Sequence, residues 1–163
     1  MMRNPWTALA ALALISCGGN DAERGGGDTA TTDPNATYNE ELDGLLEGYQ
    51  SWPQVVAGPV ASEAVHGEYV ENWLNDEAKA VVDAAMGEPM PDGAILVKQG
   101  YGDAEGTDLK NLTVMWKTEG EWFWAKYDSA GELSTSGFAL EGCVACHEGD
   151  PGQQDGGVIT YDW

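Results

Sequence analysis

The chain has 163 residues and a formal net charge of −21 at pH 7. This length suits one domain with a hydrophobic core. The acidic excess repels phosphate backbones and anionic lipid head groups, so the composition argues against nucleic-acid binding. The acids are spread along the whole chain, which fits either adaptation to a salty medium or a surface for a basic partner protein.

The first residues are typical of an export signal. Arg3 precedes the apolar run 8–15, which is shorter than the ~20 residues that a membrane-spanning helix needs. The run ends in Leu14-Ile15-Ser16-Cys17-Gly18, which resembles the bacterial lipoprotein box, where the cysteine is acylated and becomes the mature N-terminus. We therefore predict a lipoprotein signal peptide over residues 1–16 and lipidation of Cys17. An ordinary signal peptide cut nearby, with Cys17 incidental, is the alternative.

Residues 17–36 are predicted to form a flexible tether. Much of the stretch consists of Gly, Asp, Asn, Ala and Thr, which bury too little apolar surface to offset the entropy of folding. Acyl chains on Cys17 would hold the following domain at a membrane surface without a spanning helix. We expect an exported protein of the cell envelope that is lipid-anchored, faces the periplasm or exterior, and touches the membrane through its anchor alone.

Residues 37–163 are predicted to form one domain that begins with helices. Thr37-Tyr38-Asn39-Glu40 has the form of a capping box, and Trp52-Pro53 ends the helix that it would start. Asn75 is the expected N-cap of a second helix with an acidic first turn. The expected apolar stripes are Leu42, Leu45, Leu46 and Tyr49 for the first helix and Ala78, Val81, Val82 and Ala85 for the second.

The pattern then changes from helix to strand. Residues 94–98, 112–117 and 121–127 are rich in β-branched and aromatic residues, and residues 68–74 look extended. Glu119-Gly120 suits a tight hairpin. The predicted fold class is α+β, a mainly antiparallel β meander with two or three helices packed on it.

The strongest chemical signal is the segment Cys143-Val144-Ala145-Cys146-His147. In a Cys-x-x-Cys-His segment two thiols can add across the vinyl groups of a haem, while the adjacent His reaches the iron as an axial ligand. We therefore predict a C-terminal haem-binding segment with one covalent haem c, in which Cys143 and Cys146 form the thioether links. His147 is the predicted proximal ligand of the iron.

Other uses of a Cys-x-x-Cys segment are less well supported. A thioredoxin-like dithiol sits near the start of a βαβ unit, and here too little sequence follows His147 for that fold. A zinc site needs about four ligands, and His66 is the one remaining candidate of the right type apart from Cys17.

Four segments together resemble the cytochrome P460 and cytochrome c′-β family: residues 93–98, 113–117, 122–127 and 142–147. The resemblance covers roughly residues 52–148, and only the haem motif within it is highly specific. It implies a mainly antiparallel β fold, a c-type haem with a proximal His, and a distal side that is often open. In the P460 branch a strand lysine is cross-linked to the haem and the enzyme oxidises hydroxylamine, while in the c′-β branch an uncross-linked iron binds nitric oxide.

The lysine that matches the P460 cross-link is Lys98. Period-two alternation places Ala94, Leu96 and Lys98 on one strand face, where desolvation lowers the pKa of an amine toward a neutral, nucleophilic form. In the alternative interpretation its stem covers apolar surface while the charge reaches water. With Lys117 as the anchor, the family's distal carboxylate falls at Thr113, which cannot act as a general base near neutral pH. Carboxylates that could replace it are those of Glu68, Glu71 and Glu141.

Several other residues are candidates for the haem environment. His66 could be a sixth iron ligand or a proton carrier, with a structural role before a strand as the alternative. The three methionines outside the signal peptide that could offer a thioether are expected to serve in packing: Met86, Met90 and Met115. Four tryptophans are expected to wall the haem and the core: Trp73, Trp116, Trp122 and Trp124.

Three functions follow from this cofactor. The protein could be a haem-dependent oxidoreductase acting on hydroxylamine, a binder of nitric oxide or a similar diatomic ligand, or an electron carrier that meets a basic redox partner at the membrane. The axial ligands and the distal pocket decide among them.

Overall fold

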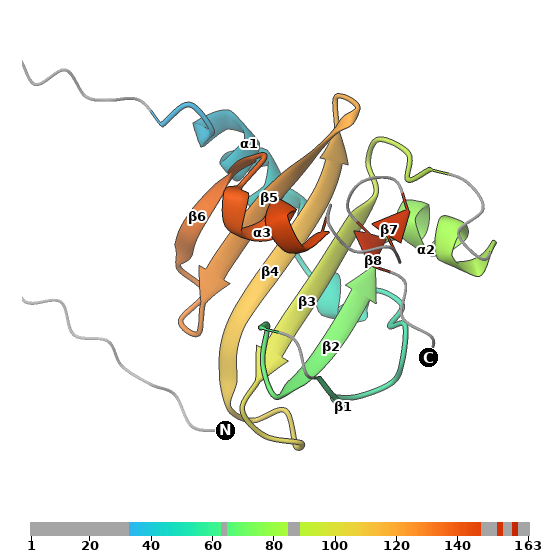
Figure 1. The fold of residues 1–163 in the computed structure, drawn as a ribbon, viewed down its shortest axis with the longest axis vertical. Coiled ribbons are helices and arrows are strands. Elements are labelled where there is room, and N and C mark those ends of the chain that lie inside the picture. The colour runs from blue at the N-terminus through green and yellow to red at the C-terminus, as the bar shows by residue number, and fades with distance from the viewer. Residues whose placement is uncertain (1–32, 63–64, 85–88, 148–152, 155–157, 160–163) are drawn as a thin grey trace, which may run out of the picture. The chain divides into compact units, whose positions relative to one another are not determined.

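The computed structural model describes residues 33–62, 65–84, 89–147, 153–154 and 158–159 (Figure 1). The predicted signal peptide, Cys17, nearly all of the predicted tether, Ala85 and Met86 lie outside these residues. The helices are α1 (Ala36–Leu45), the 3-10 turn η1 (Tyr49–Ser51), α2 (Asp76–Asp83) and α3 (Glu141–His147). The strands are β1 (Val60–Ala61), β2 (Tyr69–Leu74), β3 (Ile95–Tyr101), β4 (Leu109–Thr118), β5 (Glu121–Asp128), β6 (Leu133–Phe138), β7 (Gln153–Gln154) and β8 (Val158–Ile159).

Strands β1 to β6 form one antiparallel sheet in chain order, so each strand pairs with its neighbours in sequence. At the β4–β5 turn Glu119 has φ 52° and Gly120 has φ 78°. Positive φ at both central residues matches the turn whose twist suits a two-residue hairpin. The predicted α+β class, antiparallel meander and Glu119-Gly120 hairpin are confirmed.

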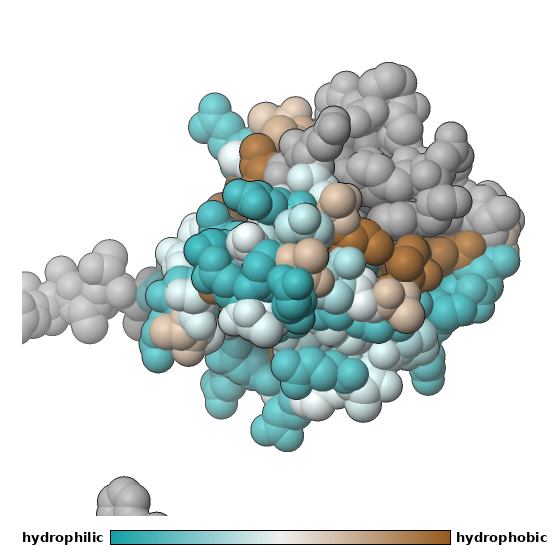
Figure 2. Space-filling view, turned by 90° about the horizontal axis from the view of Figure 1, so that it is seen from below, coloured by the Kyte–Doolittle hydropathy of each residue, from teal (hydrophilic) through white to brown (hydrophobic). Residues whose placement is uncertain are grey.

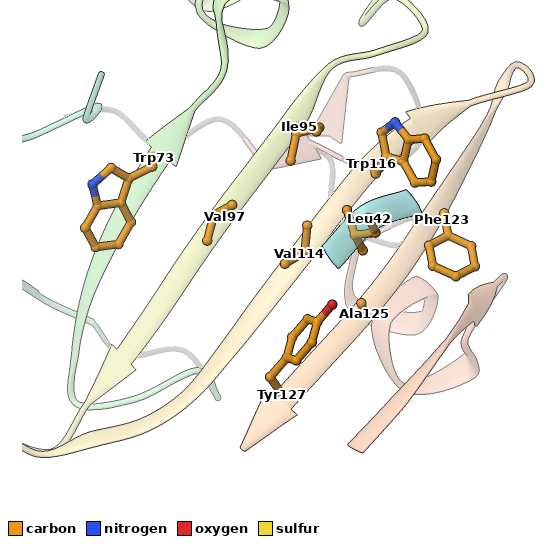
Figure 3. Close-up of a cluster of buried hydrophobic side chains, with 9 residues drawn as sticks. All are labelled: Leu42, Trp73, Ile95, Val97, Val114, Trp116, Phe123, Ala125 and Tyr127. Atoms are coloured by element: carbon orange, nitrogen blue, oxygen red, sulfur yellow. The ribbon is translucent and has the colours of Figure 1, made fainter. Parts of the chain in front are cut away.

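The two faces of this sheet are covered by different helices. Figure 1 shows α3 in front of the sheet and α1 behind it. On the α1 face lies a cluster of buried side chains, drawn in Figure 3, which we call the α1-side core: Leu42, Trp73, Ile95, Val97, Val114, Trp116, Phe123, Ala125 and Tyr127. On the opposite face lies the α3-side cluster: Leu74, Ala78, Val81, Met90, Ala94, Trp122 and Trp124, with Leu96, Met115, Leu140, Cys143 and Val144 packed against it.

Helix α2 begins as predicted, whereas α1 does not. The Ala78 amide donates to Asn75 Oδ1 at 3.1 Å, and the same oxygen accepts from the Ile95 amide at 2.9 Å. Asn75 therefore caps α2 and ties it to β3. Helix α1 starts at Ala36, which places Thr37 inside its first turn and makes the predicted capping box wrong.

The predicted apolar stripe of α1 is only partly buried. Leu42 is fully buried in the α1-side core, and Leu46 and Tyr49 pack against it, but Leu45 is 41% exposed. Leu45 is the last residue of α1 and the chain turns before η1, so the helical spacing stops holding at that point.

The outer strand β6 was not predicted, because most of its residues are small or polar and its first three are exposed.

Figure 2 shows a largely hydrophilic surface interrupted by a band of hydrophobic residues. None of the helices in the described part of the chain is long and apolar enough to cross a membrane.

Candidate haem-binding site

Helix α3 carries the predicted haem motif directly after the sheet. Ala139 adopts a left-handed φ of 51°, which turns the chain out of β6, and the Leu140 carbonyl then accepts from the amides of Cys143 and Val144, both at 2.9 Å. Both cysteines of the motif are thiols, and their separation of three residues places them near the same side of one helical turn. Cys143 is partly buried and Cys146 is exposed.

His147 is the buried end of this helix. Its side chain is 9% exposed, and its ring lies edge-on to Trp124 of β5 with 5.0 Å between the centroids. Its ring centroid is also 6.2 Å from that of His66, with 71° between the ring planes. The two histidines of the sequence, 81 residues apart, therefore meet on the α3 face.

The sheet presents two rows of side chains on this face. Residues directly opposite in neighbouring strands share a face, and the register pairs Leu96 with Met115 and Met115 with Trp124. These three side chains form an apolar row. The next row pairs Lys98 with Thr113 and Thr113 with Lys126. The prediction that Ala94, Leu96 and Lys98 share a face is thus confirmed, and it is the face on which α3 packs.

Lys98 is partly buried, and burial lowers the pKa of its ammonium. The direction is the one that makes an amine more readily neutral and nucleophilic. Lys98 also lies close enough to His66 to lower the pKa of that ring. The lysine identified from the P460 resemblance is therefore next to the histidine pair.

Lys126 belongs to the same environment and was not predicted as part of it. Burial raises the pKa of the Cys143 thiol, and the charge of Lys126 opposes this effect. Lys126 follows Trp122 and Trp124 at a spacing of two in β5, so its place on the α3 face could have been predicted from strand alternation. A cation here lies beside one of the two thiols that would attach a haem.

His66 is held against the sheet by its backbone. The side-chain amide of Asn111 donates to the His66 carbonyl at 2.9 Å. Thr113 Oγ1 lies 3.4 Å from His66 Nδ1. Burial lowers the pKa of His66 to about 4, assisted by the charges of Lys98, His147 and Lys126. The ring is therefore neutral near pH 7.

The carboxylates considered as replacements for Thr113 do not gather beside it. Glu71 accepts a hydrogen bond from the Tyr101 hydroxyl at 2.7 Å and one from the Gln54 side-chain amide at 3.2 Å. It lies two residues before Trp73 in β2 and therefore shares the α1 face with it. Glu68 and Glu141 are exposed. The titratable residues next to Thr113 are instead His66, whose Nδ1 lies 3.4 Å from its Oγ1, and its cross-strand neighbours Lys98 and Lys126.

The tryptophans divide between the two faces. Trp122 and Trp124 lie in the α3-side cluster, while Trp73 and Trp116 lie in the α1-side core. All four are therefore core residues as predicted, and two of them lie on the face that also holds the haem motif. Met90 is buried in the α3-side cluster and Met115 packs against it, as expected for packing residues.

The residue types on the α3 face fit a haem. A c-type haem needs two thiols, one axial histidine and an apolar or aromatic surface for the macrocycle, and these are supplied by α3 and by the row from Leu96 to Trp124. Within the described ranges, no three or more His, Cys, Asp or Glu side chains form a group that could hold a metal ion. Haem iron depends less on such a group, because the porphyrin supplies four of its ligands.

Two cavities of about 430 and 510 Å³ lie elsewhere. One is lined by residues around Glu68, Tyr101 and Lys110, the other by residues around Leu46 and Tyr127 on the α1 face. Neither is lined by Cys143, Cys146 or His147. The candidate haem surface is therefore the α3 face and not one of these two cavities.

No protein-family model matches this chain, and no curated protein matches it. The functional interpretation consequently depends on the haem motif and on the residues that the fold brings around it.

Proposed function

We propose that the chain is a c-type haem protein of the bacterial cell envelope that binds or converts a small nitrogen oxide, hydroxylamine or nitric oxide, at its haem iron. The observation that carries this proposal is the position of α3. It places Cys143 and the buried His147 against an aromatic and apolar face that also holds Lys98, with the exposed Cys146 one helical turn after Cys143. A bound haem would supply an iron centre for ligand binding and electron transfer.

The residues of the chain have distinct parts in this proposal. Cys143 and Cys146 would attach the haem, and His147, whose ring packs against Trp124, would bind the iron. Leu96 and Met115 offer apolar contact to the macrocycle. Lys98, desolvated on the same face, is the candidate for the haem cross-link that the P460 resemblance implies.

A second candidate function is electron transfer without catalysis. The observation that favours it is the proximity of His66 to His147, because two axial histidines leave no open position on the iron. In this case the partner is a basic redox protein, which the acidic surface would attract.

Covalent haem attachment is the first test. Expressed in a bacterium that exports the chain and matures c-type cytochromes, the protein should retain haem stain on a denaturing gel, since thioether links survive unfolding. The Cys143→Ala/Cys146→Ala double variant should lose the stain, while Cys17→Ala should keep it. Wild-type protein without haem stain would contradict the proposal.

The visible spectrum separates the two candidate functions. A high-spin spectrum that shifts with carbon monoxide supports ligand chemistry at an open iron. A low-spin spectrum unmoved by carbon monoxide supports electron transfer. A red-shifted Soret band would further support the Lys98 cross-link.

A further inference from the structure

We propose that His66 is the second axial ligand of the haem iron, opposite His147. This inference rests on the haem attachment in the proposed function, since it requires the haem that Cys143, Cys146 and His147 would hold. Of the two candidate functions it favours electron transfer, because small-ligand chemistry would first require displacement of His66. It names the residue that controls whether that iron is open.

The first support is the spacing of the two rings. A metal–imidazole nitrogen bond is about 2.0 Å long and the ring centroid lies about 1.1 Å beyond the nitrogen, so two imidazoles on opposite sides of one metal have centroids about 6 Å apart. The rings of His66 and His147 are 6.2 Å apart. Their interplanar angle of 71° is compatible with axial coordination by both rings, because each ring can rotate about its own bond to the metal.

The second support is the way the backbone brings His66 onto the sheet. A Cβ at Gly100 would lie 1.6 Å from the His66 carbonyl oxygen, and a Cβ at Gly67, whose φ is 158°, would lie 2.8 Å from the Tyr101 amide nitrogen. Only a residue without a side chain allows the segment to cross β3 this closely. The Asn111 amide then holds the His66 carbonyl in place.

The third support is the orientation of the His66 ring. Thr113 Oγ1 is 3.5 Å from the Lys98 carbonyl, to which it donates, and 3.4 Å from His66 Nδ1. A hydroxyl that donates its one hydrogen to a carbonyl is left to accept from a ring N–H. Both contacts are long, and they are compatible with the Nδ1–H tautomer, which leaves the Nε2 lone pair for a metal. A hydrogen bond to the non-ligating nitrogen is the usual way in which a ligand histidine is oriented.

Lys98 and Met115 are the competing axial residues on this face. An amine or a thioether can also bind haem iron, and both side chains lie on the same two rows of the sheet as Thr113 and Trp124. His66 differs from them because its ring already lies at the separation from His147 that a shared iron requires. Any small ligand would have to displace His66 before reaching the iron.

The experiment compares wild-type protein, His66→Ala and Val65→Ala, all haem-loaded, by visible and electron paramagnetic resonance spectroscopy at neutral pH. Wild-type and Val65→Ala proteins should be low-spin, since residue 65 is 89% exposed and its side chain is not needed at the site. His66→Ala should become high-spin and gain carbon monoxide binding. Added imidazole should restore its low-spin spectrum by filling the vacated position.

Two further measurements keep the test decisive. If His66→Ala does not accumulate, the near-infrared charge-transfer band of the oxidised wild-type protein distinguishes a His/Met pair from a pair of nitrogen ligands. A Lys98→Ala variant that loses the low-spin spectrum would assign the ligand to the lysine instead.

The inference is overturned by a high-spin wild-type spectrum, by a His66→Ala spectrum that stays low-spin, or by a band of another axial pair. Absence of covalent haem from the wild-type protein overturns the proposed function instead, so the two failures are distinguishable.

Discussion

Lys98 illustrates how one residue can separate the branches suggested by the resemblance. Lys98 lies in one row with Thr113 and Lys126, next to the row that contains Leu96, and burial lowers the pKa of its amine. Joining that amine to a carbon of the macrocycle replaces an N–H and a C–H bond with an N–C bond, which is a two-electron oxidation. The link would therefore form only when an oxidant such as a peroxide is supplied.

The prediction for Lys98 is a covalent link in protein matured with a peroxide present. Peptide mapping should find Lys98 joined to the haem peptide that contains Cys143 and Cys146, together with a red-shifted Soret band. Lys98→Ala should show an ordinary c-type spectrum, and Lys126→Ala serves as the matched lysine control. A tryptic cleavage after Lys98 in fully haem-loaded, peroxide-treated protein would count against the P460 branch.

Single residues also show why part of the site was predictable and part was not. Cys143, Cys146 and His147 are adjacent in sequence, so their chemistry can be inferred from spacing alone. The approach of His66 to His147 depends on two glycines and on Asn111, which lie on other segments of the chain. A contact between residues that are 81 positions apart leaves no pattern in the local sequence. From the sequence alone, His66 before a strand could therefore equally have a structural role.

At the scale of elements, hydrogen bonds from tyrosines hold α1 and β2 to the rest of the sheet. The buried Tyr127 of β5 donates to Asp43 of α1 at 2.8 Å, and the buried Tyr101 of β3 donates to Glu71 of β2 at 2.7 Å. Burial, followed by these hydrogen bonds, raises the pKa of both phenols. The folded protein therefore keeps both phenolic protons to higher pH than the unfolded chain, in which tyrosine has a pKa of about 10.

This difference predicts alkaline destabilisation. Below pH about 10 both states are protonated and the stabilisation is fully present, whereas at higher pH the unfolded chain loses protons first and the free energy of unfolding falls. Denaturant unfolding at pH 8 and pH 11 measures the loss. Tyr127→Phe should cost about 1 to 3 kcal/mol at pH 8, as for a hydrogen bond to a charged group, and should show a smaller further loss at pH 11.

The matched control for Tyr127→Phe is Tyr69→Phe. It removes a tyrosine of the same sheet and leaves the hydrogen bonds of Tyr127 and Tyr101 to their carboxylates in place. Equal pH dependence in the two variants would contradict the role assigned to Tyr127.

The elements predicted from sequence are those whose local pattern and tertiary packing agree. Helix α2 has its cap at Asn75, and the β4–β5 hairpin has its Glu119-Gly120 turn, so both follow from local chemistry. Strand β6 lacks apolar alternation because it lies at the outer edge of the sheet and exposes much of its length. The start of α1 was misplaced because tertiary contacts decided it: Asn35 donates its side-chain amide to the Ser136 carbonyl of β6.

At the scale of the whole molecule, the distribution of cations contrasts with the net charge of −21. Within the described part of the chain, Lys79 and Lys110 pair with Asp83 and Asp108 at the surface. The remaining three lysines there lie on the α3 face: Lys98, Lys117 and Lys126. Lys117 lies over the Trp122 ring at 5.1 Å. Three of the five lysines in the described residues are thus concentrated on the α3 face, the face that the proposal assigns to the haem.

Membrane attachment is the prediction that belongs to this scale. Wild-type protein should be found in the membrane fraction of the expressing bacterium and should enter a detergent phase. Cys17→Ser should move it to the soluble periplasmic fraction with haem loading unchanged, because the lipid and the haem involve separate parts of the chain. The Cys143→Ala/Cys146→Ala variant is the complementary control, losing haem and keeping the anchor. A wild-type protein already in the soluble fraction would refute the anchor.

The position of α3 after the last strand of the sheet also bears on how the protein matures. Each strand from β1 to β6 pairs only with neighbours in sequence, so the sheet consists of local contacts that form early in folding. The α1-side core contains no residue of α3, and its burial does not wait for a haem. In the proposed export, translocation from the N-terminus would bring the sheet across the membrane before the two thiols of the motif. The attachment machinery would therefore meet a domain already assembled, with a docking face ready and only its final helix still to be fixed.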